Sequence, residues 1–245
     1  MRRRGVGVLS ITDHDTLEAY DGEPDMAAAS GARIVRGVEI NTTYRGNEVH
    51  VLGFGVRRGA EAFEAALASN RAARTERVAQ IVRRLNAHGI PLAAEAVAAE
   101  TRGSSVGRPH VAIALLRAGY VRSIDAAFRT LLARGCPAYV PSLHMTPQEA
   151  IDLVAGAGGV CVLAHPGRLT DDGIVDELAE CGLVGLEVFY PSHSPSQRSY
   201  FRGRARDLGL VMTAGSDFHD PRYNAAGVGM DVDEDDIRPF LDLVL

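Results

Sequence analysis

Residues 6–16 read VGVLSITDHDT, an apolar run that ends in a cluster of polar side chains. The run from Val6 to Ile11 has the length and character of a strand buried on both faces, as parallel strands are. In parallel α/β folds the active site is built at the carboxyl ends of the strands, where His14 stands here. Asp13 and Asp15 flank His14 and either orient its ring or begin the next helix. The stretch therefore predicts an α/β protein whose chemistry includes His14.

Strands and helices alternate on both sides of a central segment. Residues 17–30 are typical of a helix, and Thr146–Glu149 (TPQE) is a capping box with proline at the first helical position. Further strands are expected at 33–40 (RIVRGVEI), 47–54 (NEVHVLGF), 160–164 (VCVLA), 184–190 (VGLEVFY) and 210–214 (LVMTA), with a helix at 194–208. This alternation predicts an α/β sheet or barrel.

Residues 59–140 follow a different pattern. Apolar residues recur there at helical spacing, as in Phe63, Leu67, Val78, Ile81, Val82 and Leu85. Pro109 begins a helix that stops at Gly119, and Ser123 caps another that stops at Gly135. We therefore expect a barrel in two parts, 1–58 and 141–245, interrupted by an all-helical insertion domain at 59–140.

The composition is that of a globular chain. Its 245 residues, 46% of them hydrophobic, are enough to bury a sizeable core. Apolar runs are too short to cross a bilayer, so no membrane association is expected. Cys136, Cys161 and Cys181 form no close pair, which argues against a thiolate metal site and against a disulfide framework. We expect a cytoplasmic protein without an obligate protein partner.

The charge is unevenly distributed. All 26 basic residues are arginines, and 13 of them lie between Arg57 and Arg134 against six acidic residues, a local net charge of +7 in a chain of net charge −5. Arginine binds phosphate through a planar fork, so the basic segment suits a phosphorylated substrate. The alternative is an ordinary solvated helical surface.

Six residues of metal-ligand type stand at or near the carboxyl ends of the expected strands: His14, Glu39, His50, His165, Asp217 and His219. A single such histidine is more often a structural residue, but six in equivalent places favour one shared site. Imidazole and carboxylate ligands without thiolate favour Mn, Zn or Fe. A carboxylate such as Glu39 can bridge two ions that hold a hydroxide for in-line attack on phosphorus.

Short motifs surround these residues in a fixed order: ITDHDT (11–16), GVEI (37–40), VHVLG (49–53), LAHPGR (163–168) and GSDFH (215–219). In this order the sequence resembles the PHP (polymerase and histidinol phosphatase) phosphoesterases over nearly its whole length. GRPHVA (107–112), AYVP (138–141) and YPSHS (190–194) are similar to the subfamily of 3′,5′-nucleotide bisphosphate phosphatases and RNase AM-type 5′-to-3′ exoribonucleases. The resemblance implies a distorted (β/α)7 barrel with up to three divalent metal ions and a small helical domain over its mouth.

The resemblance also distributes the ligands. It gives one ion to His14 and His219, a second to His50 and His165 with Glu39 bridging, and a third to Asp217 with Glu39. The family begins with a strand that carries His-x-His, which occurs nowhere in this sequence. We therefore expect that the first barrel strand is missing and that fewer ions bind. A start site assigned too far downstream, or a cut gene, explains this departure better than a natural variant.

Four further residues are candidates for contact with the substrate. The resemblance makes Arg108 the first choice for gripping a phosphate, although it could be a surface arginine at a helix start. His110 and Arg168 are further phosphate candidates. His193 could meet the leaving-group oxygen, or it could cap the helix that follows.

We therefore expect a metal-dependent phosphoric ester hydrolase that acts on 3′,5′-bisphosphate nucleotides or trims short RNA from its 5′ end. Two alternatives stay open. Amidohydrolase barrels also gather His and Asp around metals but cleave C–N bonds, and here the basic segment with GRPH favours phosphate. A barrel without its first strand could instead be a catalytically impaired nucleotide-binding protein.

Overall fold

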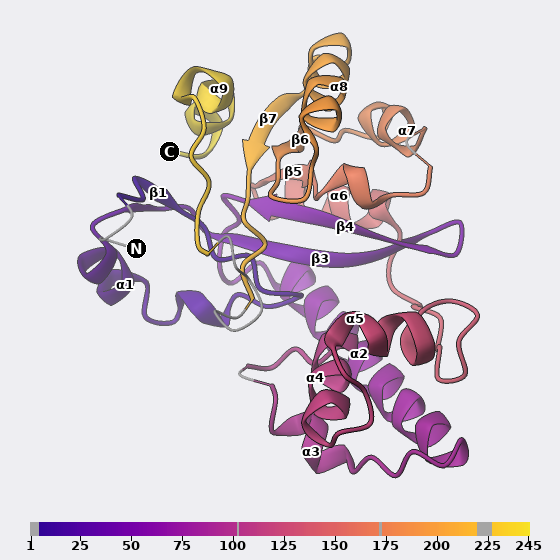
Figure 1. Cartoon of the computed structure of the whole chain (residues 1–245). Coiled ribbons are helices and arrows are strands. Elements are labelled where there is room, and N and C mark those ends of the chain that lie inside the picture. Colours follow the sequence, from indigo (N-terminus) through magenta and orange to yellow (C-terminus); the bar gives the residue numbers. More distant parts are fainter. Residues whose placement is uncertain (1–4, 102, 172, 220–226) are drawn as a thin grey trace.

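A long β-hairpin forms the centre of the fold in the computed structural model, which describes residues 5–101, 103–171, 173–219 and 227–245 (Figure 1). Its strands are β3 (Gly37–Tyr44) and β4 (Asn47–Phe54), paired antiparallel from Gly37 opposite Phe54 to Tyr44 opposite Asn47. Arg45 and Gly46 join them with φ of 48° and 75°. Such positive values are what the common two-residue hairpin turn requires.

The hairpin is one side of a five-stranded mixed sheet with the order β3-β4-β5-β6-β7. β4 pairs antiparallel with β5 (Val160–Leu163), whereas β5, β6 (Gly185–Phe189) and β7 (Val211–Ala214) run parallel. The expectation that every ligand follows a parallel strand end is wrong for this hairpin. Glu39 and His50 lie within β3 and β4. These two strands are antiparallel, as a two-residue turn requires, so their carboxyl ends lie at opposite ends of the hairpin.

The strand expected at 33–40 is two strands. β2 (Arg33–Ile34) pairs in parallel with β1 (Val8–Leu9) in a separate small sheet, and β3 begins at Gly37. The buried Tyr20 hydroxyl holds the break: it donates to Val35 O and accepts from Gly37 N. A Cβ at Gly37 would collide with Ser10 Oγ. Long-range packing therefore interrupts a run that sequence alone presents as continuous.

Three helices, α6 (Pro147–Gly156), α7 (Ile174–Glu180) and α8 (Pro195–Asp207), lie on one side of the hairpin (Figure 1). The apolar face of the hairpin joins their buried residues in the main core, which includes Val38, Ile40, Val49, Val51, Val154, Leu178 and Leu186. Gly53 allows close approach, since a Cβ there would lie 2.9 Å from Val154 Cγ2. The capping box at the start of α6 is confirmed: Thr146 Oγ1 accepts from Glu149 N.

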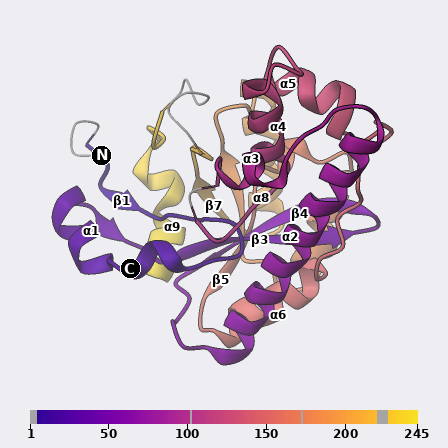
Figure 2. The same cartoon turned by 90° about the horizontal axis from the view of Figure 1, so that it is seen from below.

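The helical segment lies below the hairpin in Figure 1. Seen from below, α2 (Glu61–Ala87) crosses β3 and β4 (Figure 2). It packs with α3 (Ala94–Ala98), α4 (Arg108–Arg117) and α5 (Ile124–Ala127) around a second core that includes Ile81, Leu85, Val111, Leu115, Leu132 and Val140. The helical content predicted for 59–140 is thus present, while its standing as a separate insertion domain stays a prediction.

Two predicted helices are shorter than expected. The segment 17–30 is a 3-10 turn at Glu18–Tyr20 followed by α1 (Glu23–Ser30), because Gly22 and Pro24 favour a new helix start. Ser123 caps α5 as predicted, but the helix continues as a π-helical turn at Phe128–Leu132. Near the end of the chain, α9 (Glu234–Val244) packs on β7.

The mixed α/β fold is confirmed. The described strands form the five-stranded sheet and the small β1–β2 sheet, with one further parallel bridge between His14 and Glu39. Closure into a barrel and the missing first strand stay predictions. Within the described residues, none of the helices combines the length and apolar character that crossing a membrane requires.

Candidate metal centre

One face of the hairpin is polar. Side chains alternate along a strand, so Glu39, Asn41 and Thr43 of β3 share a face with Glu48 and His50 of β4. The apolar face packs on α6, together with Phe63 and Leu67 from the first part of α2. The sequence positions of Glu39 and His50, interpreted as strand ends, are in fact neighbours across the middle of the hairpin.

Glu39 is the hub of the predicted ligands. Its Oε1 lies 2.6 Å from His50 Nδ1 and 3.2 Å from His165 Nε2. Its Oε2 lies 3.7 Å from His14 Nδ1. The rings of His14 and His50, and those of His50 and His165, have centroids 5.2 Å apart. Three of the predicted ligands, His14, His50 and His165, therefore meet around the carboxylate of a fourth, Glu39.

The protonation states of Glu39 and His14 favour cation binding. Burial alone would raise the pKa of Glu39, but His14 and His50 beside its carboxylate hold that pKa well below its usual range. Burial lowers the pKa of His14 well below its usual value. Burial acts in the same direction on His50, but the Glu39 carboxylate outweighs it and raises the pKa of His50. Near neutral pH the cluster thus offers an ionised carboxylate and an uncharged imidazole.

The donor atoms fit a metal ion. One ligand atom each from His14, Glu39 and His50 lie within 4.8 Å of one another. His165 Nδ1 is buried and has no hydrogen-bond partner among the described residues. Buried imidazole nitrogens rarely stay unsatisfied, and a cation is the partner that this nitrogen and oxygen set suits.

A buried network positions His14. Asp15 is fully buried, with φ of 54°, and its Oδ1 accepts from Asn41 N (3.0 Å) and from Asn70 Nδ2 (2.9 Å). Asn41 Nδ2 bonds to Asp15 Oδ2 and lies 3.2 Å from His14 Nδ1. Asn70 belongs to α2, so the helical segment contributes a hydrogen-bond donor to the network around His14. Arg74, one turn further along α2, lies with its Nη1 4.0 Å from Asp15 Oδ2.

Asp217 and His219 lie beside this cluster. The His219 ring centroid is 6.0 Å from that of His14, and His219 Nδ1 lies 3.3 Å from Asp217 Oδ1. Asp217 Oδ2 accepts from the Tyr190 hydroxyl (3.0 Å) and lies 3.4 Å from Arg168 Nη1. All six predicted ligands are therefore in one region, with Arg168 attached to it through Asp217.

The phosphate candidates differ in their surroundings. Arg108, the first residue of α4, is paired with Glu48, which also accepts from Arg77. Burial alone would raise the pKa of Glu48, but Arg108 and Arg77 lower it to about 2. His110 turns back onto its own helix start, where its Nδ1 accepts from Gly107 N (3.1 Å).

His193 is not placed as predicted. It is buried behind Tyr190, its Nδ1 donates to Val188 O (2.9 Å), and its Nε2 accepts from Gly167 N (3.1 Å). Both ring nitrogens are engaged with backbone, so neither faces a leaving group. The helix cap is Ser194 instead, whose Oγ accepts from Gln197 N. His193 holds the loop that carries His165 and Arg168.

Sequence reasoning missed several polar residues of the site. Arg74 and Asn70 are buried on α2, whose other arginines are half-buried or exposed, and only their helical spacing with the apolar positions could have marked them as inward-facing. Tyr190 is hidden in the apolar run VGLEVFY. His144, expected to be an ordinary loop residue, has its pKa lowered to about 4 by burial and by Arg74 and Arg77.

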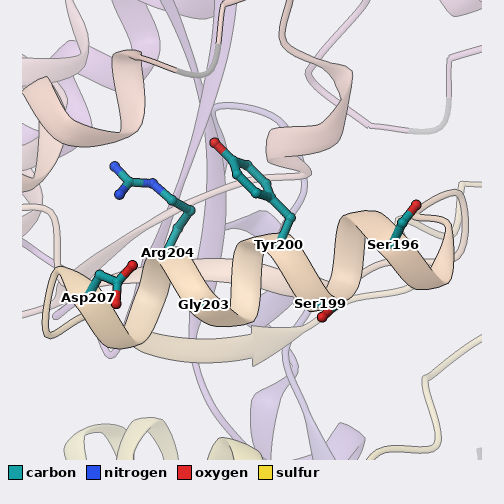
Figure 3. A pocket seen from close by; sticks show the side chains of 6 residues that line it. All are labelled: Ser196, Ser199, Tyr200, Gly203, Arg204 and Asp207. Atoms are coloured by element: carbon teal, nitrogen blue, oxygen red, sulfur yellow. The ribbon is translucent and has the colours of Figure 1, made fainter.

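Two hollows mark the surface. A shallow one of about 520 Å³ is lined by one face of α8, from Ser196 to Asp207, and none of the predicted site residues contributes to it (Figure 3). A smaller one, about 170 Å³, lies between the start of β4 and the segment after His165. Glu48 and Arg168 both line this second hollow, which places it next to the cluster.

The comparisons with known proteins agree with this geometry. The chain is 34% identical over 223 residues to the 5′-3′ exoribonuclease Rnm of Escherichia coli, covering 88% of this chain and 76% of the relative. It is 33% identical over 233 residues to the 3′,5′-nucleoside bisphosphate phosphatase of Chromobacterium violaceum, covering 92% and 81%. The chain belongs to the PHP family of metal-dependent phosphoesterases. It is thus a phosphoric ester hydrolase, although no family model matches it.

Solved structures of two similar proteins share the fold. A protein of Bifidobacterium adolescentis assigned as a metal-dependent phosphoesterase superposes with a TM-score of 0.88 at 32% identity, covering 100% of this chain and 88% of that one. A Chromobacterium violaceum protein described as an amidohydrolase, with bound sulfate and no metal, superposes with a TM-score of 0.87 at 31% identity, covering 94% and 82%.

Proposed function

We propose that this PHP protein hydrolyses phosphate esters of nucleotides, either 3′,5′-bisphosphate nucleotides or short RNA that it trims from the 5′ end. The observation that carries the proposal is the ionised Glu39 carboxylate surrounded by His14, His50 and His165, with Arg108 paired to Glu48 on the same face of the hairpin. Relatives named for these two activities support the substrate class.

The metal ligands of the proposal are His14, Glu39, His50, His165, Asp217 and His219. Their nitrogen and oxygen donors suit Mn, Zn or Fe. When bound, divalent ions activate water as a nucleophile and neutralise charge on the phosphoryl group. The chain itself would keep Glu39 ionised and His14 uncharged, the states in which both can bind a cation.

Arginines would hold the phosphate groups. Arg108 and Arg77 share the single carboxylate of Glu48, which leaves a net positive charge next to His50 on the same face of the hairpin. Arg168 lies beside Asp217 and lines the same small hollow as Glu48. A nucleotide with two phosphates could place one at the metal ligands and the second against Arg108 or Arg168, with His110 nearby on α4.

Other residues would position rather than react. His193, with both ring nitrogens bonded to backbone, would fix the loop 165–168 that carries His165 and Arg168. We also propose that the two sheets are parts of a distorted (β/α)7 barrel, that residues 59–140 form a helical domain over its mouth, and that the protein acts in the cytoplasm.

The test compares products from three kinds of substrate. The full chain, loaded with Mn²⁺, is incubated with adenosine 3′,5′-bisphosphate, with 5′-phosphorylated short RNA, and with cyclic amides. We expect inorganic phosphate or 5′-mononucleotides and no ammonia, and we expect E39Q to release neither product. Ammonia release would support the amidohydrolase alternative. Nucleotide binding without turnover would support a catalytically impaired binding protein.

A further inference from the structure

Glu187 is a buried carboxylate next to the proposed metal ligands and has no part in the proposed function. It lies in β6, is 5% exposed, and its Oε2 accepts from His165 N at 2.9 Å. Burying a carboxylate costs free energy of folding unless the group is hydrogen-bonded. A carboxylate buried near two others, Glu39 and Asp217, therefore needs a hydrogen-bonding partner that stabilises it. The hydrogen bond to the backbone of His165 supplies one.

His165 has an unusual backbone. Its φ and ψ are 30° and 57°, in the left-handed region, and Pro166 follows it. A residue before proline favours extended conformations, and a residue in a sparsely populated region costs about 1–3 kcal/mol to hold. This conformation is what turns the ring so that Nε2 reaches Glu39 Oε1 at 3.2 Å. A restraint on the backbone of His165 is therefore a restraint on its ring.

Gly215 makes room for Glu187. This glycine follows β7, and its N–H donates to Phe189 O at 3.0 Å. A Cβ on Gly215 would collide with Glu187 Oε1 and lie 3.1 Å from its Cδ. The φ of Gly215 is not positive, so space rather than backbone freedom explains the glycine. Gly215 in the motif GSDFH and Glu187 in the strand VGLEVFY thus pack directly against each other.

We propose that Glu187 is a positioning residue that fixes His165 for metal binding, and that Gly215 is a glycine in order to admit its carboxylate. The inference rests on the metal site of the proposed function. Without an acceptor for its N–H, His165 can relax toward the extended conformation that Pro166 favours, and its ring leaves Glu39.

The test measures Mn²⁺ affinity by isothermal titration calorimetry on the metal-free full chain. E187M has similar size and no acceptor, E187Q keeps an oxygen acceptor, and G215A displaces the carboxylate without changing it. Loss of partners that orient ligands weakens metal binding by about 10–100-fold, which we expect for E187M and G215A. We expect E187Q to bind Mn²⁺ as the unmodified chain does. Melting temperatures without metal check that each variant folds, and if E187M or G215A does not fold, the other decides.

The outcomes separate this inference from the metal site itself. If the unmodified chain binds no Mn²⁺, the proposed metal site fails. If the unmodified chain binds Mn²⁺ and folded E187M or G215A binds it equally well, Glu187 does not position His165. If E187Q is as defective as E187M, the charge of Glu187 matters and the proposed acceptor role is overturned.

Discussion

Glu39 Oε1 lies 2.6 Å from His50 Nδ1, although the two residues stand on different strands of the hairpin. In the antiparallel register Glu39 is opposite Leu52 and His50 is opposite Asn41, so the pair meets along a diagonal of one sheet face. The contact depends on the two-residue turn, since a slip of one residue would send His50 to the apolar face. The proposed metal site therefore depends on the register of the hairpin, which brings Glu39 and His50 onto one face.

Glu39 is expected to be indispensable for catalysis. E39Q keeps the size of the side chain but removes the charge that faces three histidines. We expect the turnover number to fall by about 10³-fold or more, which corresponds to about 4 kcal/mol of lost transition-state stabilisation. Phosphate release under saturating substrate measures it. E180Q, at an exposed position of α7, is the matched control and should change nothing.

Asn70 is expected to join α2 to the site. Its Nδ2 donates to Asp15 Oδ1 and to Asn41 O, at 2.9 and 2.8 Å, in a buried environment. N70A leaves a buried carboxylate short of one donor, so we expect the free energy of unfolding to fall by about 2 kcal/mol. Urea denaturation checks this. S69A changes an exposed neighbour on the same helix, and an equal loss there would contradict the assignment.

Glu48 gives a stability that depends on pH. Its pKa is lowered to about 2 from an ordinary value of 4.5, because Arg108 and Arg77 outweigh burial. A lowered pKa in the folded state stabilises the protein above the unfolded pKa, and this contribution is lost as pH falls toward 2. We expect E48Q to be less stable than the unmodified chain at pH 7 by about 1–3 kcal/mol.

The same comparison across pH tests the cause of that difference. Between pH 7 and 5.5 the gap in unfolding free energy should stay constant, and below pH 4.5 it should shrink. A gap that persists unchanged down to pH 3 would mean that the amide, and not the lost charge, destabilises E48Q.

The three cysteines should react differently. Cys161 is 2% exposed in β5, and burial raises the pKa of its thiol, whereas Cys136 and Cys181 are half-buried. The thiolate is the reactive form, so native protein at pH 8 should be alkylated by iodoacetamide at Cys136 and Cys181 only. Peptide mass spectrometry locates the label. Unfolded protein, labelled at all three positions, is the control, and rapid native labelling of Cys161 would contradict the buried strand.

Much of the fold could be predicted from sequence because its strands are short apolar runs between turn residues. The run NEVHVLGF is β4 without a change of boundary. The direction of β4 and the break before Gly37 were not predictable in this way. The first follows from a turn geometry, and the second from the Tyr20 hydroxyl, which bonds to backbone far away in the chain.

The sequence was enough to predict which residues of the candidate site are of metal-ligand type. It was not enough to predict what each residue contacts, and so what role it could have. Histidine is a common catalytic residue type, yet both ring nitrogens of His193 are hydrogen-bonded to backbone, one to Val188 O and the other to Gly167 N. Glu187 lies in a run whose other members are apolar, so nothing local distinguishes it from a strand residue. The proposed role of Glu187 depends on its contacts with His165 and Gly215, which are distant in sequence and lie beside it only in the folded chain.

The proposed function requires that imidazole and carboxylate groups from separate parts of the chain converge on shared cations. A crystal structure of the full chain grown with Mn²⁺, with anomalous scattering data, tests it most directly. We expect an anomalous peak within coordination distance of Glu39 and at least two of His14, His50 and His165. A map without a peak there, or with the only ordered Mn²⁺ elsewhere on the surface, would contradict the account.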